Sequence, residues 1–148
     1  MGNICRSPTA EAVFRAVAVR AAPTLRIEAD SAGTHDYHVG APPDPRAQRV
    51  AAFHGIDMSR LRARLLSADD FERFDYVLVM DRNNLSVARC LAPPQRQNRI
   101  QLLLDYAPQQ PLREVPDPYY GGEADFELVF ELAQQAAHGL LEFLSNRT

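Results

Sequence analysis

Three short segments of the chain have the pattern of β-strands. Polar and apolar residues alternate over 25–29 (LRIEA), and nearly continuous apolar runs occupy 75–80 (DYVLVM) and 99–104 (RIQLLL). A short apolar run is typical of a strand that a parallel sheet buries on both faces. Because helical segments separate these runs, we expect an α/β fold with a parallel sheet and right-handed crossovers.

Cap residues, proline and helical spacing mark the helices. A Ser or Asp followed by Pro predicts helix starts at Ser7 and Asp44, Asp81 predicts a third, and Gly55 predicts a C-terminal stop. The last helix has a core-facing stripe of apolar residues, namely Phe126, Val129, Phe130, Ala133, Ala137, Leu140, Leu141 and Leu144. Helices are predicted over residues 8–20, 44–54, 81–89 and about 123–144, and a further short helix is predicted to begin at 67–70.

Composition narrows the class of protein. The chain has 148 residues, of which 46% are hydrophobic and 24% charged, which suits a single globular domain over 1–148. Its net charge of −3 argues against a nucleic-acid partner, and no apolar run is long enough to span a membrane. Two cysteines, Cys5 and Cys90, are too few for a disulfide framework or a zinc site. We therefore expect a reduced, cytoplasmic protein that needs no metal or other cofactor.

Residues 2–8 (GNICRSP) have the character of an anion-binding loop. Gly2 allows the backbone to turn inward, so that successive N–H groups converge at a helix N-terminus. Arg6 adds a guanidinium fork that suits a tetrahedral oxyanion. A loop of this kind normally follows a strand, whereas no strand precedes it in this sequence.

This loop and several later motifs together resemble the low-molecular-weight protein tyrosine phosphatases. The matching stretches are GNICRSPTAEAVFR, ADSAG (29–33), VGAPPDPRA (39–47), HGIDMS (54–59), DYVLVMD (75–81) and DPYYGGEADFELVFELA (117–133). They cover the whole chain in order. The resemblance implies a three-layer sandwich around a four-stranded parallel sheet, and an enzyme that hydrolyses phosphotyrosine through a cysteinyl phosphate without a metal.

The chain departs from the family signature, Cys-x5-Arg-Ser, at its first position. With Arg6 as the arginine, the nucleophilic cysteine falls immediately before Met1. We therefore expect an N-terminal truncation that removes the nucleophile and the first, inner strand of the sheet, and an inactive chain. We expect either a three-stranded remnant of the sheet with a gap beside 75–80, or another segment or chain that fills this place. The alternatives are a pseudophosphatase that binds phosphate or phosphotyrosine without turnover, and an arsenate reductase, which is disfavoured because only Cys90 lies in the second half.

The resemblance also assigns roles to individual residues. Arg6 should bind the phosphoryl oxygens, and Asp117 should be the general acid that protonates the leaving phenol. Cys5 is adjacent to Arg6, so it cannot lie in line beneath phosphorus, and we expect an inert thiol. The phosphate-binding loop would comprise Gly2, Asn3, Ile4, Cys5, Arg6 and Ser7, the substrate ring would contact Ile4, Tyr37, Tyr119 and Tyr120, and Asp30 and Ser31 would support the site from behind.

The expected partner is a protein that carries phosphotyrosine. Ile4 favours phosphotyrosine, because related enzymes that act on phosphoarginine tend to have Thr at this site. Autophosphorylated tyrosine kinases are the usual bacterial targets of the family, although no residue of this chain singles one out. The sequence leaves the oligomeric state open.

Overall fold

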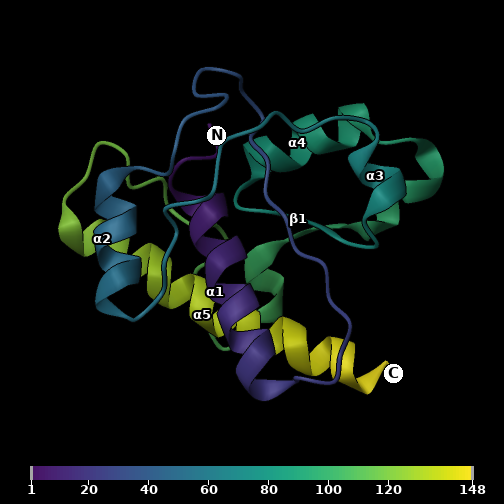
Figure 1. The fold of residues 1–148 in the computed structure, drawn as a ribbon. Coiled ribbons are helices and arrows are strands. Elements are labelled where there is room, and N and C mark those ends of the chain that lie inside the picture. The colour runs from purple at the N-terminus through teal and green to yellow at the C-terminus, as the bar shows by residue number, and fades with distance from the viewer. Residues whose placement is uncertain (1, 148) are drawn as a thin grey trace.

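The computed structural model describes residues 2–147 (Figure 1). Helices α1 and α5 cross at its centre, and α3 and α4 lie together on one side (Figure 1). The strands lie between these two pairs of helices (Figure 1). None of the helices in the described range combines the length and hydropathy needed to cross a bilayer. The elements in chain order are α1 (Arg6–Ala21), α2 (Pro45–Phe53), α3 (Asp70–Arg73), β1 (Val77–Val79), α4 (Arg82–Leu91), the 3₁₀ turn η1 (Pro94–Arg99), β2 (Ile100–Leu102), the 3₁₀ turn η2 (Leu103–Tyr106) and α5 (Glu123–Asn146).

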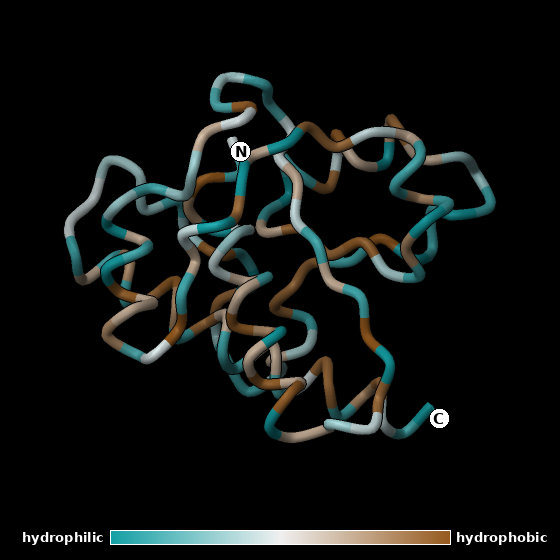
Figure 2. Tube along the Cα trace, viewed as in Figure 1, coloured by the Kyte–Doolittle hydropathy of each residue, from teal (hydrophilic) through white to brown (hydrophobic). Residues whose placement is uncertain are grey.

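The sheet contains two strands within residues 2–147, so neither the four-stranded sheet implied by the resemblance nor its expected three-stranded remnant is found. β1 and β2 pair in parallel, with Val77 opposite Ile100 and Val79 opposite Leu102. Residues 25–29, predicted as a strand, alternate between half-buried and exposed but pair with no neighbour. Figure 2 shows the same segment, after α1, changing repeatedly between hydrophobic and hydrophilic colours. The alternating exposure of 25–29 agrees with the sequence pattern, but a β-ladder also requires an adjacent strand with which to pair.

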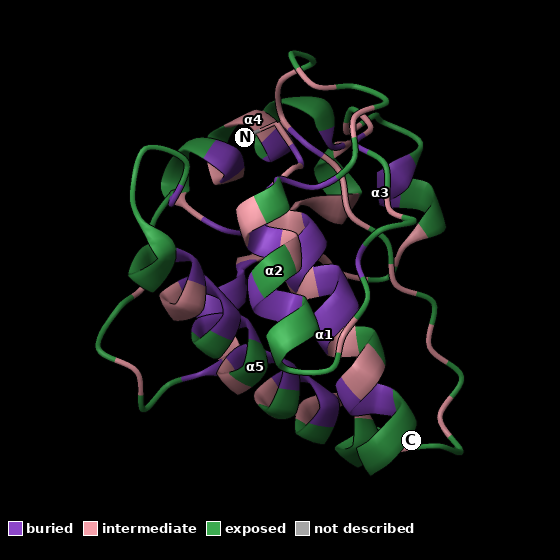
Figure 3. Ribbon diagram, turned by 60° about the vertical axis from the view of Figure 1, so that its left-hand side comes forward, coloured by how far each residue is buried: buried purple, intermediate pink, exposed green. Residues whose placement is uncertain are grey.

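A gap lies beside 75–80, as one of the two expected arrangements has it, but the sheet next to it has two strands and not three. Residues 26–32 and 74–80 line opposite parts of a cavity of about 760 Å³, which continues up to the loop at residues 2–7. The segment after α1 runs past this gap as an isolated trace of exposed and half-buried residues (Figure 3). Its backbone is therefore extended without a partner strand on the side of β1.

Helices cover both faces of the two strands, which explains why the β1 sequence is apolar throughout. Val79 packs with Phe71 and Ala88, which belong to the α3 and α4 side. Leu78 and the adjacent Met80 pack in a second cluster with residues of η2 and α5. Successive side chains of a strand point to opposite faces, so a strand between two helical layers needs apolar residues at every position.

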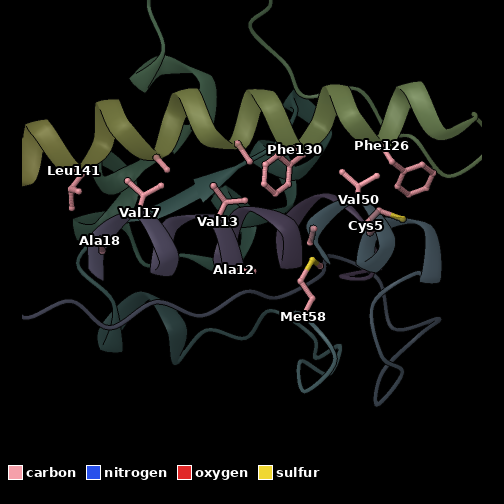
Figure 4. Packing of buried hydrophobic residues seen from close by; sticks show 14 residues of the cluster. Cys5, Ala12, Val13, Val17, Ala18, Val50, Met58, Phe126, Phe130 and Leu141 are labelled. Carbon is pink, nitrogen blue, oxygen red and sulfur yellow. The ribbon is translucent and has the colours of Figure 1, made fainter. Parts of the chain in front are cut away.

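The largest core cluster lies between α1 and α5 (Figure 4). Val13 and Val17 of α1 meet Phe130 and Leu141 of α5, and Val50 of α2 closes one end. All members of the predicted α5 stripe are buried except Leu144, which is half-buried. Helical spacing of apolar residues therefore identified the face of α5 that forms the core.

The predicted helix ends agree with the structure in part. Asp44 and Asp81 cap α2 and α4, and each accepts a backbone hydrogen bond of 2.8 Å. Gly55 follows α2 with a φ of +83°, a left-handed conformation that glycine adopts without strain. The prediction that Ser7 caps α1 is wrong, because α1 begins at Arg6 and Cys5 takes the cap position without a side-chain bond.

Gly139 provides a test of the packing between α5 and η2. A Cβ added at this glycine would lie 1.7 Å from the carbonyl oxygen of Tyr106. Gly→Ala in a helix interior ordinarily stabilises by about 1 kcal/mol. We expect Gly139→Ala to destabilise instead, by about 1–3 kcal/mol, because the backbone of η2 must move. Urea denaturation would measure this, with exposed Gln134→Ala on the same helix as control, and a stabilised Gly139→Ala would contradict the packing.

Candidate functional site

The loop at residues 2–7 and the segment around Asp117 face the same cavity. The loop leads directly into the N-terminus of α1, and the strand β1 ends close by. This location agrees with the rule that ligands of open α/β sheets bind beyond the carboxyl ends of the strands. The cavity is lined by every residue assigned to the site from the sequence, namely Gly2, Asn3, Ile4, Cys5, Arg6, Ser7, Asp30, Ser31, Tyr37, Asp117, Tyr119 and Tyr120.

Asn3 holds the shape of the loop. It is buried, and its backbone has a φ of +64°, in the left-handed region that Asn tolerates better than most residues. Its side-chain amide donates to the Oγ atoms of Ser7 (2.7 Å) and Ser31 (3.0 Å), and its Oδ1 accepts from the backbone N–H of Arg64 (3.0 Å). Both amide protons and the carbonyl oxygen are thus satisfied, so Asn3 joins the loop to the first turn of α1, to Ser31 and to Arg64.

The same network continues to Glu11, for which the sequence predicts only a place in a helix. Ser31 donates to Oε1 of Glu11 (2.7 Å), and Arg15 forms an ion pair with its other oxygen (2.9 Å). Burial raises the pKa of Glu11, and the Ser31 hydrogen bond and Arg15 only partly oppose this. No local pattern reveals such a contact, because residues 11 and 31 meet through the fold.

Asp30 supports the loop from outside, through Arg64. It accepts from the backbone N–H of Ser31 (2.8 Å) and pairs with Nε of Arg64 (3.1 Å), which also pairs with Asp70 (3.0 Å). Arg64 in turn donates its backbone N–H to Asn3. Asp30 and Ser31 therefore lie behind the loop, and Arg64 joins them to it.

Arg6 is buried and points into the protein. Its Nη1 donates to Oδ2 of Asp81 (2.8 Å) and to the carbonyl oxygen of Val115 (2.7 Å). Its Nη2 is the one fully buried side-chain nitrogen or oxygen between residues 2 and 147 that lacks a partner. An unpartnered buried donor costs free energy, so an acceptor that reached Nη2 would be bound favourably.

Asp81 has a second function that sequence analysis missed. The sequence identified it as the cap of α4, and it is also the ion-pair partner of Arg6. Burial works to raise the pKa of Asp81, but hydrogen bonds from the Asn84 N–H and Arg6 outweigh it and leave that pKa lowered. The signal available in the sequence was an Asp directly after an apolar strand, at the sheet edge where ligands bind.

The segment that carries Asp117 is tied to the end of β1. The N–H of Val115 donates to the carbonyl oxygen of Met80 (2.9 Å), and Arg6 binds the carbonyl of the same Val115. Asp117 lies two residues further on, exposed, where it accepts from the N–H of Tyr119 (3.1 Å) as a turn residue does. Its carboxylate therefore lies at the open side of the cavity, on a segment that is anchored at Val115.

Arg46 of α2 holds the other end of this segment, and sequence analysis had not identified it. Its guanidinium donates to the carbonyl oxygens of Tyr119 (2.9 Å) and Gly121 (3.3 Å) and pairs with Asp44 (2.9 Å). The side-chain hydrogen bond from Arg46 is the main reason that the pKa of Asp44 is lowered. Asp44 also donates its N–H to the carbonyl of Ile4 (2.8 Å), so α2 connects the loop to the Tyr119 segment.

Aromatic rings form a row at the mouth of the cavity. Tyr37 stacks on His35 with ring centroids 5.2 Å apart, and His38 lies 6.2 Å from Tyr119. Tyr119 contacts Tyr120 edge-on, and Tyr120 is 97% exposed. Aromatic rings favour offset or edge contacts with one another, so such a row suits an aryl group. Gly2 allows His38 to approach, because a Cβ there would lie 2.5 Å from the His38 ring.

The two cysteines differ in their surroundings. Cys5 is buried, and burial, followed by the nearby carboxylates of Asp44 and Asp117, raises its pKa to about 12. Cys90 is exposed, on α4. A thiol with so high a pKa stays protonated near neutral pH and is a poor nucleophile. Among the described residues no group of three or more His, Cys, Asp or Glu is placed to hold a metal ion.

Comparisons with known proteins agree on one family. The family described as low molecular weight phosphotyrosine protein phosphatase matches residues 1–148. The chain is 40% identical to the low molecular weight protein-tyrosine-phosphatase YfkJ of Bacillus subtilis, over 95% of this chain and 89% of the relative. It is 41% identical to the low molecular weight phosphotyrosine protein phosphatase of Homo sapiens, over 96% and 90%.

Solved structures give the same result. A protein tyrosine phosphatase from Entamoeba histolytica superposes with a TM-score of 0.95 at 36% identity, covering 99% of this chain and 94% of its own. The YfkJ structure gives 0.92 at 38% identity, covering 100% and 92%. The family's α/β fold is therefore shown. These matches give no support to the N-terminal truncation expected from the sequence, and the position of the nucleophile stays a prediction.

The thiols predict a difference in alkylation. At about pH 8 we expect iodoacetamide to modify Cys5 roughly a thousandfold more slowly than an ordinary thiol, because so little of Cys5 is thiolate. Peptide mass mapping of the native chain and of Cys90→Ala would measure both rates. If Cys5 were modified as fast as Cys90 in the folded protein, the burial of Cys5 beside the carboxylates of Asp44 and Asp117 would be contradicted.

Proposed function

Because this chain belongs to the low molecular weight phosphotyrosine protein phosphatase family, we propose that its cavity is built to hydrolyse phosphotyrosine in proteins. One observation carries the proposal: Arg6 is buried with one nitrogen held by Asp81 and Val115, while its other terminal nitrogen has no partner. This donor lies at the N-terminus of a 16-residue helix, whose free N–H groups and dipole also favour an anion. Together they would bind the oxygens of a phosphoryl group.

The proposed chemistry has two steps. A cysteine thiolate attacks phosphorus, the bond from phosphorus to the phenol oxygen breaks, and Asp117 gives its proton to that oxygen. Water then attacks the cysteinyl phosphate, the phosphorus–sulfur bond breaks, and the Asp117 carboxylate takes a proton from the water. In both steps Arg6 and the loop N–H groups would stabilise the oxygens of the transition state. The exposed position of Asp117 at the cavity mouth supports its role.

The 148 residues by themselves are proposed to be inactive because neither cysteine among them lies where the nucleophile would be needed. The family signature puts the nucleophile directly before Met1. Cys5 cannot replace it, since its pKa is about 12 and it precedes Arg6 in sequence. Ser7 cannot replace it either, because its Oγ accepts from Asn3 and no base is seen beside it in the described part of the chain.

The substrate is proposed to be a phosphotyrosine side chain on a protein. Ile4 and the row formed by Tyr37, Tyr119 and Tyr120 are proposed to contact its ring, and their place around one cavity supports this. The aryl group would stack or meet these rings edge-on. A bacterial, cytoplasmic setting with an autophosphorylated tyrosine kinase as substrate remains part of the proposal. The Bacillus subtilis relative supports the bacterial part, whereas the equally similar Homo sapiens relative does not.

A second candidate function is binding of phosphate or phosphotyrosine without turnover. It is favoured by the fact that the free donor of Arg6 and the loop held by Asn3 require no nucleophile. In that case Asp117 would have no catalytic function, and the protein would sequester phosphorylated side chains.

Hydrolysis of para-nitrophenyl phosphate distinguishes these functions. We expect no turnover by the 148-residue chain and clear turnover after a strand-forming segment that ends in cysteine is joined to its N-terminus. In the extended protein, Asp117→Asn should lower kcat for phenyl phosphate, whose leaving phenol is only weakly acidic, by about 10²–10⁴-fold. It should lower kcat for para-nitrophenyl phosphate by less, because that leaving phenol is already acidic. The matched control is Asp69→Asn, an exposed carboxylate that makes no capping bond.

Three outcomes would contradict parts of this proposal. Equal activity of the short and extended proteins would show that the nucleophile lies within the chain. An unchanged kcat for Asp117→Asn with a poor leaving group would remove Asp117 from the mechanism. An extended protein that binds phosphate but never turns over would favour the binding function.

A further inference from the structure

An arginine holds each end of the short segment that carries Asp117. We name the segment from Val115 to Tyr119 the bridge, and Asp117 lies at its midpoint. At one end Nη1 of Arg6 donates to the carbonyl oxygen of Val115 (2.7 Å). At the other end Nη2 of Arg46 donates to the carbonyl oxygen of Tyr119 (2.9 Å). The position of the Asp117 carboxylate is therefore set from both ends of the bridge.

Two prolines make the bridge stiff. Pro116 and Pro118 flank Asp117 on either side, and Pro118 is fully buried. A proline ring fixes its own φ at about −65° and restricts the residue before it, so few backbone torsions of the bridge are free to rotate. A displacement at one end of the bridge would therefore move Asp117 as well, because the backbone between them cannot absorb it.

Arg46 fixes its end of the bridge with three different nitrogens. Its Nε and Nη2 donate to the two carboxylate oxygens of Asp44, at 3.0 and 2.9 Å. Its Nη2 also donates to Tyr119, and its Nη1 donates to the carbonyl oxygen of Gly121 (3.3 Å). The guanidinium lies over the ring of Phe126, 4.5 Å from the ring centroid. A planar fork held in this way has little freedom to turn, so it fixes the Tyr119 carbonyl and the turn that follows.

The loop at residues 2–7 supports both ends of the bridge. Arg6 belongs to this loop and holds one end directly. The backbone N–H of Asp44 donates to the carbonyl oxygen of Ile4 in the same loop (2.8 Å), and Asp44 in turn holds Arg46. An anion bound in the loop would therefore meet the Asp117 carboxylate at a distance that is fixed from two sides.

We propose that Arg46 is a positioning residue, which keeps Asp117 where it can give its proton to the leaving phenol. This role rests on the proposed function, in which Asp117 is the general acid. Without Arg46 the bridge would lose its hold at Tyr119 and could pivot about Val115. A misplacement of about 1 Å can lower a catalysed rate by roughly 100-fold. Binding of the phosphoryl oxygens should stay the same, because Arg6 and the loop N–H groups bind them.

Leaving-group dependence in the N-terminally extended protein tests this role. Arg46→Met keeps much of the side-chain volume and removes every donor. We expect it to lower kcat/KM for phenyl phosphate by about 10–100-fold and for para-nitrophenyl phosphate by less than about threefold, because the more acidic phenol leaves without a proton. The inhibition constant of inorganic phosphate should change by less than about twofold, since phosphate has no leaving phenol. A general loosening of the cavity would instead lower kcat/KM for both substrates alike.

Further variants separate this role from a structural one. When Arg46→Met is added to Asp117→Asn, kcat/KM for phenyl phosphate should fall by less than about twofold more, since both changes remove the same proton transfer. Arg46→Lys should recover part of the loss, because a lysine can still pair with Asp44 but cannot reach both carbonyls. Arg49→Met is the matched control: it removes an exposed arginine from the same helix and should leave both substrates unaffected.

Hydrogen exchange in the 148-residue chain provides a measurement without turnover. The N–H of Gly121 is bonded to the carbonyl oxygen of Pro118 (2.8 Å), in the turn that Arg46 holds. In Arg46→Met we expect this amide to exchange at least about tenfold faster, because the turn opens more often, whereas Arg49→Met should leave its rate unchanged.

Three results would overturn the positioning role of Arg46. These are an equal loss for the two aryl phosphates, a full additional loss in the Asp117→Asn background, or unchanged exchange at Gly121. Each leaves the proposed hydrolysis intact as long as Asp117→Asn itself acts mainly on phenyl phosphate. If the extended protein shows no turnover, or if Asp117→Asn shows no such preference, the proposed role of Asp117 fails, and the role of Arg46 fails with it.

Discussion

The buried guanidinium of Arg6 is the constraint on which the rest of the site depends. Its side chain is only 3% exposed, and removing a charge from water is expensive unless partners replace the lost hydration. Asp81 and the Val115 carbonyl supply those partners at 2.8 and 2.7 Å. Breaking such a buried pair typically costs about 3–5 kcal/mol. The N-terminus of α1, the end of β1 and the Asp117 segment must therefore stay close together.

Other polar contacts fix the parts of the site that the Arg6–Asp81 ion pair does not reach. Asn3, which is itself in a left-handed conformation, fixes the loop through three hydrogen bonds, so the loop is already shaped before an anion binds. Arg46 holds the far end of the Asp117 segment, while Val115 holds its near end. A site fixed in advance loses little conformational entropy on binding, and its donors need not reorganise during the reaction. Among the buried side chains of residues 2–147, Arg6 is the one left with an unused donor.

Local patterns in the sequence predicted the helices well and the contacts between them poorly. The stripe on α5 and the caps at Asp44 and Asp81 depend on neighbours within a few residues, so the sequence contains them. The ladder predicted at 25–29 failed because a strand needs a partner beside it, and alternation carries no information about that partner. Ser7 does not cap α1, because the helix begins before it and its hydroxyl accepts a hydrogen bond from Asn3.

The site was predictable only as far as its motifs extended. The loop, Asp117 and the tyrosines came from recognisable stretches, and they line one cavity. Asp81, Arg46 and Glu11 were missed as members of the site because their partners lie 75, 73 or 20 residues away in sequence. Only the fold brings such pairs together. The one indication of them in a sequence is a charged residue at a position expected to be buried, because such a charge needs a partner.

Titration of inorganic phosphate into the native chain and Arg6→Lys tests the central claim most directly. Lysine keeps the charge for Asp81 but has no second nitrogen to offer an anion. The account predicts that calorimetry will show at least about tenfold weaker phosphate binding for Arg6→Lys. Exposed Arg20→Lys, at the far end of α1, should bind as the native chain does. Equal phosphate affinity for the native chain and Arg6→Lys would contradict the account.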